Sequence, residues 1–210
     1  MNDNYKNKYR IASTRLQNWD YGWNGLYFIT ICTQNRECYF GDILDRKMNL
    51  SPIGKMAEKY WLEIPNHFPF VKLDVFVVMP NHIHGIIIID KPNNEQNTDT
   101  DTVETQNLAS LQQPKQTSKN KFGPQSKNLA SIIRGFKIGV TKYVKNNKLE
   151  FGWQPRFYDH IIRNEKSYQT ISEYIVNNPV KWETDKLNSR TGNAVMEQSS
   201  VETQYFAPLL

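Results

Sequence analysis

The sequence predicts an α+β fold, because runs of strand-forming residues alternate with helical apolar periodicity along the 210-residue chain. Strand formers gather at 27–33, 75–79, 82–89 and 153–162. Helical spacing of apolar residues appears at 51–64, 128–144 and 164–178. This order of elements predicts a ferredoxin-like β-α-β-β-α-β sandwich, with one antiparallel sheet, helices on one face and an extra C-terminal helix.

The first elements carry clear boundary signals. Tyr27–Thr33 is rich in aromatic and β-branched residues and should form the first core strand. A small hairpin is expected from Tyr39–Ile43 and Lys47–Leu50. Ser51 then provides an N-cap and Pro52 a first helical residue, so a helix should begin there and end near Pro65.

Two apolar runs around a Met-Pro-Asn turn form the predicted centre of the sheet. Side chains two residues apart on a strand share a face, so His82 and His84 should project side by side while Ile83 faces the other way. Neutral imidazoles bind divalent transition ions, which makes this pair a candidate metal site. The alternative is a structural pair whose ring nitrogens are satisfied by backbone groups.

The last predicted helix carries Tyr174 and Asn178, which share a face because they are four residues apart. If this face covers His82 and His84, two imidazoles, an amide oxygen and a phenol meet. The first three groups can hold one divalent ion, and the phenol can attack a phosphodiester beside it. The alternatives are that Tyr174 is a core residue and that Asn178 is only a helix C-terminal residue.

The composition divides the chain into parts. We expect an N-terminal arm at 1–24, a folded domain at 25–184 and a loose C-terminal tail at 185–210. Within the domain, residues 91–127 are dominated by Asn, Gln, Thr, Ser, Asp and Lys, so they should form a flexible polar insertion.

The overall charge and the cysteine count bound the function. A formal net charge of +5 favours a polyanionic partner, although an ordinary basic surface would also explain it. Two cysteines exclude a disulfide framework and a cysteine-rich zinc site. The N-terminus has no apolar signal segment and no run is long enough for a bilayer, so we expect a cytoplasmic protein without a membrane partner.

Three motifs in order resemble the single-tyrosine HUH transposases of the IS200-like superfamily, and specifically the REP-associated tyrosine transposase branch. They are Met79–Gly85, Trp153–Asn164 and Tyr174–Val180, joined by N-terminal similarity at Trp19–Tyr21 and Tyr27–Thr33. The resemblance covers roughly 15–182 apart from the polar insertion.

The resemblance implies a site and an activity. His82, His84 and Asn178 would bind Mg²⁺ or Mn²⁺, and Tyr174 would be the nucleophile. The implied activity is cleavage and rejoining of single-stranded DNA beside hairpins through a 5′-phosphotyrosine, in a bacterial cytoplasm and on the nucleoid when DNA-bound. Two alternatives stay open: a hairpin-binding protein that has lost cleavage, and a ferredoxin-like RNA-binding module. The sequence does not decide between a monomer and a homodimer.

Basic and aromatic residues in the second half are candidate DNA contacts. Cationic side chains would contact phosphates and aromatic rings would stack on bases, although aromatic residues at such spacing are more often core. The candidates are Arg134, Lys137, Arg156, Arg163, Trp153 and Phe157.

Overall fold

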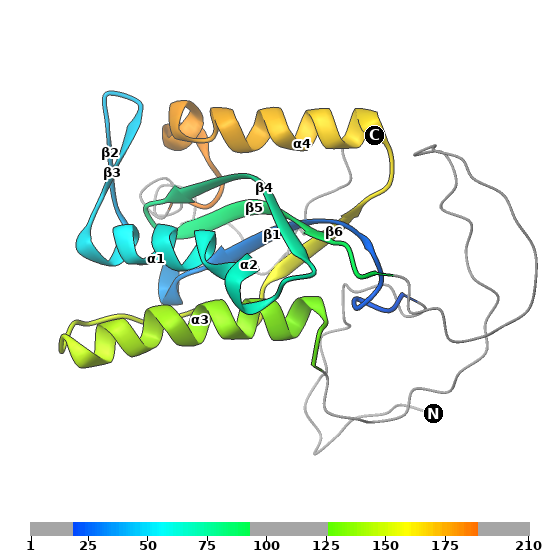
Figure 1. Cartoon of the computed structure of the whole chain (residues 1–210). Helices are drawn as coiled ribbons and strands as arrows, with labels where there is room; N and C mark the ends of the chain where they lie inside the picture. Colours follow the sequence, from blue (N-terminus) through cyan, green and yellow to red (C-terminus); the bar gives the residue numbers. More distant parts are fainter. Residues whose placement is uncertain (1–18, 93–125, 189–210) are drawn as a thin grey trace, which may run out of the picture.

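The computed structural model describes residues 19–92 and 126–188, and these form a four-stranded sheet with helices on both faces and a separate two-stranded hairpin (Figure 1). The predicted insertion lies almost wholly outside the described residues, as do most of the arm and the tail. The four-stranded sheet has the order β4-β5-β1-β6, with every neighbouring pair antiparallel. Its strands are β1 (Gly25–Cys32), β4 (Val71–Met79), β5 (His82–Ile89) and β6 (Tyr158–Ile162).

The helices and the small hairpin complete the predicted element order. Between β1 and β4 lie η2 (Gln34–Arg36), the hairpin β2 (Gly41–Leu44) and β3 (Lys47–Leu50), α1 (Pro52–Leu62) and α2 (Ile64–His67). After β5 come α3 (Leu129–Asn146), α4 (Glu165–Asn177) and η3 (Pro179–Thr184). The predicted α+β fold with an antiparallel sheet is confirmed. None of the described helices is long and apolar enough to cross a membrane.

Two boundaries differ from the prediction for physical reasons. β4 begins at Val71 rather than Val75, because Val71–Leu73 pairs with Ile87–Ile89 across an irregularity before Phe76. The last strand is shorter than 153–162: only Tyr158–Ile162 joins the sheet, and Trp153 makes an isolated bridge to Thr33.

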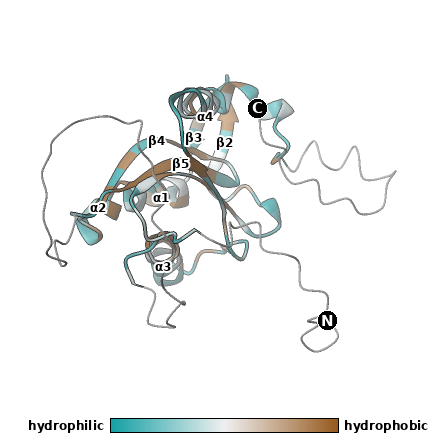
Figure 2. Ribbon diagram, turned by 90° about the vertical axis from the view of Figure 1, so that its right-hand side faces the viewer, coloured by the Kyte–Doolittle hydropathy of each residue, from teal (hydrophilic) through white to brown (hydrophobic). Residues whose placement is uncertain are grey.

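The sheet lies between two layers of helices, with α4 on one side and α1 and α3 on the other (Figure 2). One face packs on α1 and α3, with Tyr27, Ile29, Ile83 and Ile87 among its buried residues. The other face packs on α4 through Phe28, Ile86, Ile162 and Ile175. Because alternate residues face opposite sides, the parity of β5 places His82 and His84 on the α4 face.

Gly85 fits the sheet tightly against α1. A Cβ atom at this position would lie 2.5 Å from Cζ2 of Trp61, which is fully buried. The glycine in the His-Ile-His-Gly motif thus lets the Trp61 ring pack directly under the strand that carries both histidines. This packing fixes one side of the strand, while the imidazoles project from the other.

Candidate functional site

The two histidines lie under α4 at the start of β5. Both are buried, and their ring centroids are 4.4 Å apart. The rings project toward α4, where Tyr174 and Asn178 lie one helical turn apart. The phenolic oxygen of Tyr174 is 3.2 Å from Nε2 of His84. All four predicted site residues are therefore brought together by the packing of α4 over β5.

Asn81 orients the ring of His82. Its amide nitrogen donates to the backbone carbonyls of Arg36 and Leu187 at 3.1 Å and 2.7 Å, so Oδ1 is the atom that faces the imidazole. An amide oxygen only accepts, so His82 Nδ1 carries the hydrogen and donates to it at 2.8 Å. His82 Nε2 is left with a lone pair, and this buried atom has no hydrogen-bond partner among the described residues.

Thr30 orients the ring of His84 in the same way. Its hydroxyl oxygen lies 2.9 Å from Nδ1 of His84, on the neighbouring strand β1. When Nδ1 donates to Thr30, Nε2 is the acceptor that meets the Tyr174 hydroxyl. Both imidazoles thus present Nε2 on the α4 side, with a polar group behind each ring, as is usual for metal-binding histidines.

Asn178 completes the group with an amide oxygen. The residue is buried, and its Nδ2 donates to a carboxylate oxygen of Asp185 at 3.1 Å. Oδ1 is buried and has no hydrogen-bond partner in the described part of the chain. The Asn178 amide also lies close enough to influence the pKa of both His82 and Tyr174. Two acceptor atoms, His82 Nε2 and Asn178 Oδ1, are therefore buried together without a donor.

Burial sets the protonation of the site. It lowers the pKa of His84 to about 3 and that of His82 well below its usual value, and neighbouring His84 adds to the second shift. Both rings are neutral at physiological pH, which is the form that binds a metal ion. Burial, followed by the charge of Asp185, raises the pKa of Tyr174 to about 12, so the phenol keeps its proton at neutral pH.

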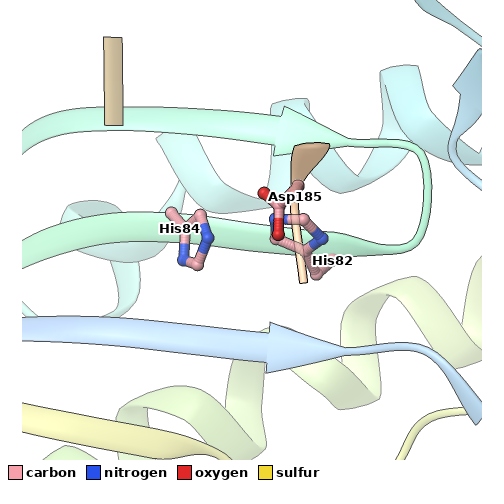
Figure 3. Close-up of side chains that lie close together, drawn as sticks. All are labelled: His82, His84 and Asp185. Atoms are coloured by element: carbon pink, nitrogen blue, oxygen red, sulfur yellow. The ribbon is translucent and has the colours of Figure 1, made fainter. Parts of the chain in front are cut away.

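Asp185 is a site residue that the sequence analysis did not single out. It was placed at the start of the predicted tail, yet it follows η3 directly and lies over His82 in Figure 3. One ligand atom each from Asp185, His82 and His84 lie within 4.8 Å of one another. The next residues are also packed, because Leu187 and Asn188 are buried. No local pattern in the sequence marked this segment.

Comparisons with known proteins find relatives in sequence and in structure. No family model matches the sequence. An uncharacterized protein of Haemophilus influenzae is 43% identical over 177 residues, which cover 83% of this chain and 91% of that protein. A second H. influenzae protein, described provisionally as a REP-associated tyrosine transposase, is 28% identical over 77% of this chain and 74% of its own length. A solved REP-associated tyrosine transposase bound to a REP hairpin shares the fold, with a TM-score of 0.52, 19% identity and coverage of 94% of this chain and 96% of that one.

The chain is similar in sequence to a protein described as a REP-associated tyrosine transposase and shares the fold of a solved one. This confirms the resemblance carried by the three sequence motifs. The histidine pair and Tyr174, which meet between β5 and α4, are among the residues that this resemblance singled out.

The candidate DNA contacts fall into two groups. Arg134, Lys137, Arg156 and Phe157 line a groove of about 640 Å³ along α3, on the opposite side of the sheet from α4. The charged residues that line it, which also include Lys142 and Lys145, are all basic within the described part of the chain.

The other candidates make contacts within the fold. Trp153 packs among Phe40, Phe136 and Phe151, at centroid distances of 5.6, 5.8 and 4.8 Å, as the core alternative describes. The guanidinium of Arg163 lies 5.8 Å from the centroid of the Trp19 ring and does not line the α3 groove.

Lys137 is also engaged internally although it lines the groove. Its amine donates to the carbonyls of Gln154 and Arg156 at 2.9 and 2.6 Å, and burial lowers its pKa to about 8. These contacts connect α3 to the segment that leads into β6. Among the predicted cationic DNA contacts that line the groove, Arg134 and Arg156 are exposed.

Proposed function

We propose that this protein is a transposase, a divalent-metal-dependent endonuclease and strand transferase that cleaves single-stranded DNA beside a hairpin through Tyr174. The observation that carries the proposal is the meeting of His82 Nε2, Asn178 Oδ1 and the Tyr174 hydroxyl under α4. The first two are buried acceptors without a donor in the part of the chain that the structure describes, which is a costly arrangement unless a cation lies between them.

The donor atoms fit a divalent ion. His82 and His84 would bind it through Nε2 and Asn178 through its amide oxygen, with Mn²⁺ favoured over Mg²⁺ because imidazole suits transition ions. Since the three ligands are neutral, the ion would keep its double charge for a phosphate. When bound, it supplies electrostatic stabilisation of the charge that develops on the phosphate oxygens.

Tyr174 carries the covalent chemistry. Its hydroxyl oxygen forms a bond to phosphorus, the bond from phosphorus to the 3′-oxygen breaks, and the phenolic proton finally resides on the released 3′-hydroxyl. The product is a 5′-phosphotyrosine, whose ester bond a 3′-hydroxyl can attack to rejoin strands. Because burial raises the pKa of Tyr174 to about 12, this proton must be lost during the reaction rather than before it.

The DNA has two surfaces to contact in this proposal. The solved relative is bound to a REP hairpin, which supports a hairpin as the substrate of this chain. The basic groove along α3 suits the phosphates of the hairpin stem. It lies on the other side of the sheet from Tyr174, so the stem and the cleaved strand would be held by separate surfaces.

Formation of a covalent adduct tests the proposal. The full chain is incubated with a labelled DNA hairpin carrying single-stranded flanks, in Mn²⁺ or in excess EDTA, and separated under denaturing conditions. We expect a denaturant-resistant protein–DNA band in Mn²⁺ and none in EDTA. Equal adduct in EDTA contradicts the metal role. Hairpin binding without any adduct identifies the chain as a non-cleaving binding protein.

A further inference from the structure

Three residues, Asn81, Leu187 and Asp185, connect two of the proposed ligands, His82 and Asn178, through hydrogen bonds. His82 Nδ1 donates to Asn81 Oδ1 at 2.8 Å, and Asn81 Nδ2 donates to the carbonyl of Leu187 at 2.7 Å. The amide of Leu187 donates to Asp185 Oδ1 at 2.7 Å, and Asn178 Nδ2 donates to Asp185 Oδ2 at 3.1 Å. This series of hydrogen bonds begins at the ring of His82 and ends at the amide of Asn178. The segment after η3 therefore orients both side chains.

The carboxylate of Asp185 decides which way the Asn178 amide faces. A carboxylate accepts and an amide NH₂ donates, so the nitrogen must turn to Asp185 and the oxygen to the opposite side, toward His82. We propose that Asp185 is a positioning residue of the metal site, which holds the Asn178 oxygen toward the ion without binding the ion itself. This inference rests on the proposed metal-dependent function.

The bonding pattern favours positioning over ligation. Both carboxylate oxygens of Asp185 already accept N–H groups, one from Leu187 and one from Asn178. The donorless buried acceptors are instead His82 Nε2 and Asn178 Oδ1, and neither Asp185 oxygen is among the described buried atoms without a partner. The series of hydrogen bonds therefore orients His82 Nε2 and Asn178 Oδ1, the two atoms that would bind a cation.

Asp185→Asn is the first test, because it preserves shape while replacing one acceptor by a donor. It cannot accept from both Leu187 and Asn178, so the Asn178 amide loses its fixed orientation. We expect the Mn²⁺ dissociation constant of the full chain, measured by calorimetry without DNA, to rise about 10-fold or more. The matched control is Glu183→Gln, two residues away on exposed η3, which should stay within about two-fold.

An Asn178→Asp background separates positioning from ligation. A carboxylate at 178 presents an oxygen whichever way it turns, so it needs no orienting partner. In this background we expect Asp185→Asn to lower the Mn²⁺ affinity by no more than about two-fold, because only the charge of the carboxylate and not the orientation of a ligand is lost. An equal 10-fold loss in both backgrounds identifies Asp185 as a direct ligand and overturns the proposal, since independent effects add.

The remaining outcomes are also decisive. Unchanged Mn²⁺ affinity in Asp185→Asn, with or without a lower melting temperature of the metal-free protein, rejects the positioning role while leaving the proposed function in place. A wild type that binds no Mn²⁺ contradicts both. Should the variants fail to fold, a wild-type crystal soaked in Mn²⁺ answers the question: anomalous density bonded to Asn178 Oδ1 supports the proposal, and a manganese–Asp185 bond rejects it.

Discussion

His82 Nδ1 donates to Asn81 Oδ1 across 2.8 Å, and this contact leaves the opposite ring nitrogen facing the Asn178 amide as a lone pair. Asn81 immediately precedes the histidine, so the turn between β4 and β5 contains the group that orients the first residue of β5. The same side chain also binds the η2 turn and the segment after η3 through two carbonyls. One asparagine thus connects three parts of the chain at the candidate site.

Asn81→Asp tests this connection. The carboxylate would still accept from His82, but its second oxygen would face the carbonyls of Arg36 and Leu187, which lose their donor. Buried acceptors without donors each cost about 1–3 kcal/mol, so we expect the free energy of unfolding to fall by about 2–4 kcal/mol in urea titrations. The same substitution at exposed Asn49 on β3 should cost less than about 0.5 kcal/mol. Equal stability of the two variants would argue against the connection.

The buried histidines should make the metal-free protein less stable as the pH falls. In the native state the pKa of His84 is about 3, whereas the unfolded chain takes up a proton near pH 6.5. Between these values unfolding binds protons, so the free energy of unfolding decreases with decreasing pH. From pH 7 to pH 5, His84→Gln should lose about 2 kcal/mol less than the wild type in EDTA.

The control for this pH dependence is Asn66→Gln at the exposed end of α2, which introduces the same residue without removing a titrating group and should lose as much as the wild type. Urea titrations at pH 7, 6 and 5 give the comparison. Identical pH dependence in His84→Gln and wild type would show that the unbound His84 ring takes up its proton in the native state too.

The α3 groove predicts a salt-dependent contribution to DNA affinity. Arg134 and Lys142 are exposed on the groove, and each would release about one counterion equivalent on contacting a phosphate. Arg134→Ala with Lys142→Ala should therefore weaken hairpin binding and reduce the slope of log affinity against log salt by about two. Lys55→Ala on α1, which does not line the groove, should leave the slope unchanged. An unaltered slope in the double variant places the stem elsewhere.

Lys137 should matter more for stability than for DNA. Lys137→Met keeps the aliphatic stem and removes the amine that serves the carbonyls of Gln154 and Arg156. We expect the free energy of unfolding to fall by about 1–2 kcal/mol, against less than about 0.5 kcal/mol for Lys142→Met on the same helix. A stable Lys137→Met protein with weakened hairpin binding would instead identify Lys137 as a phosphate contact.

The fold was largely predictable from the sequence because the periodic patterns are long. The β-branched runs around Met79–Pro80–Asn81 and the apolar stripes of α3 and α4 agree with the structure to within a few residues. The start signal at Ser51 was equally local, since its side chain accepts from the backbone amide three residues on. Boundaries failed where pairing decided them, as at Val71, whose strand assignment depends on Ile89.

The site was predictable only in part. His82, His84, Tyr174 and Asn178 stand out by spacing and by resemblance, and α4 does bring them together. Thr30 and Asp185 could not be found in this way, since their roles depend on strand register and on the course of the chain after η3. Trp153 was predicted as a candidate DNA contact but packs among core aromatic rings. The sequence alone does not distinguish an aromatic residue of the core from one that stacks on a base.

Tyr174→Phe tests the central claim most directly. The substitution removes one oxygen, and the remaining ring keeps its packing on Phe28 at a centroid distance of 6.3 Å, so folding and hairpin affinity should be preserved. With Mn²⁺ and a labelled hairpin, the wild type should form a denaturant-resistant adduct whose phosphopeptide maps to Tyr174 by mass spectrometry. Tyr174→Phe should form none, while the control Tyr168→Phe on the same helix should form a normal amount. An adduct of wild-type yield from Tyr174→Phe would contradict the account.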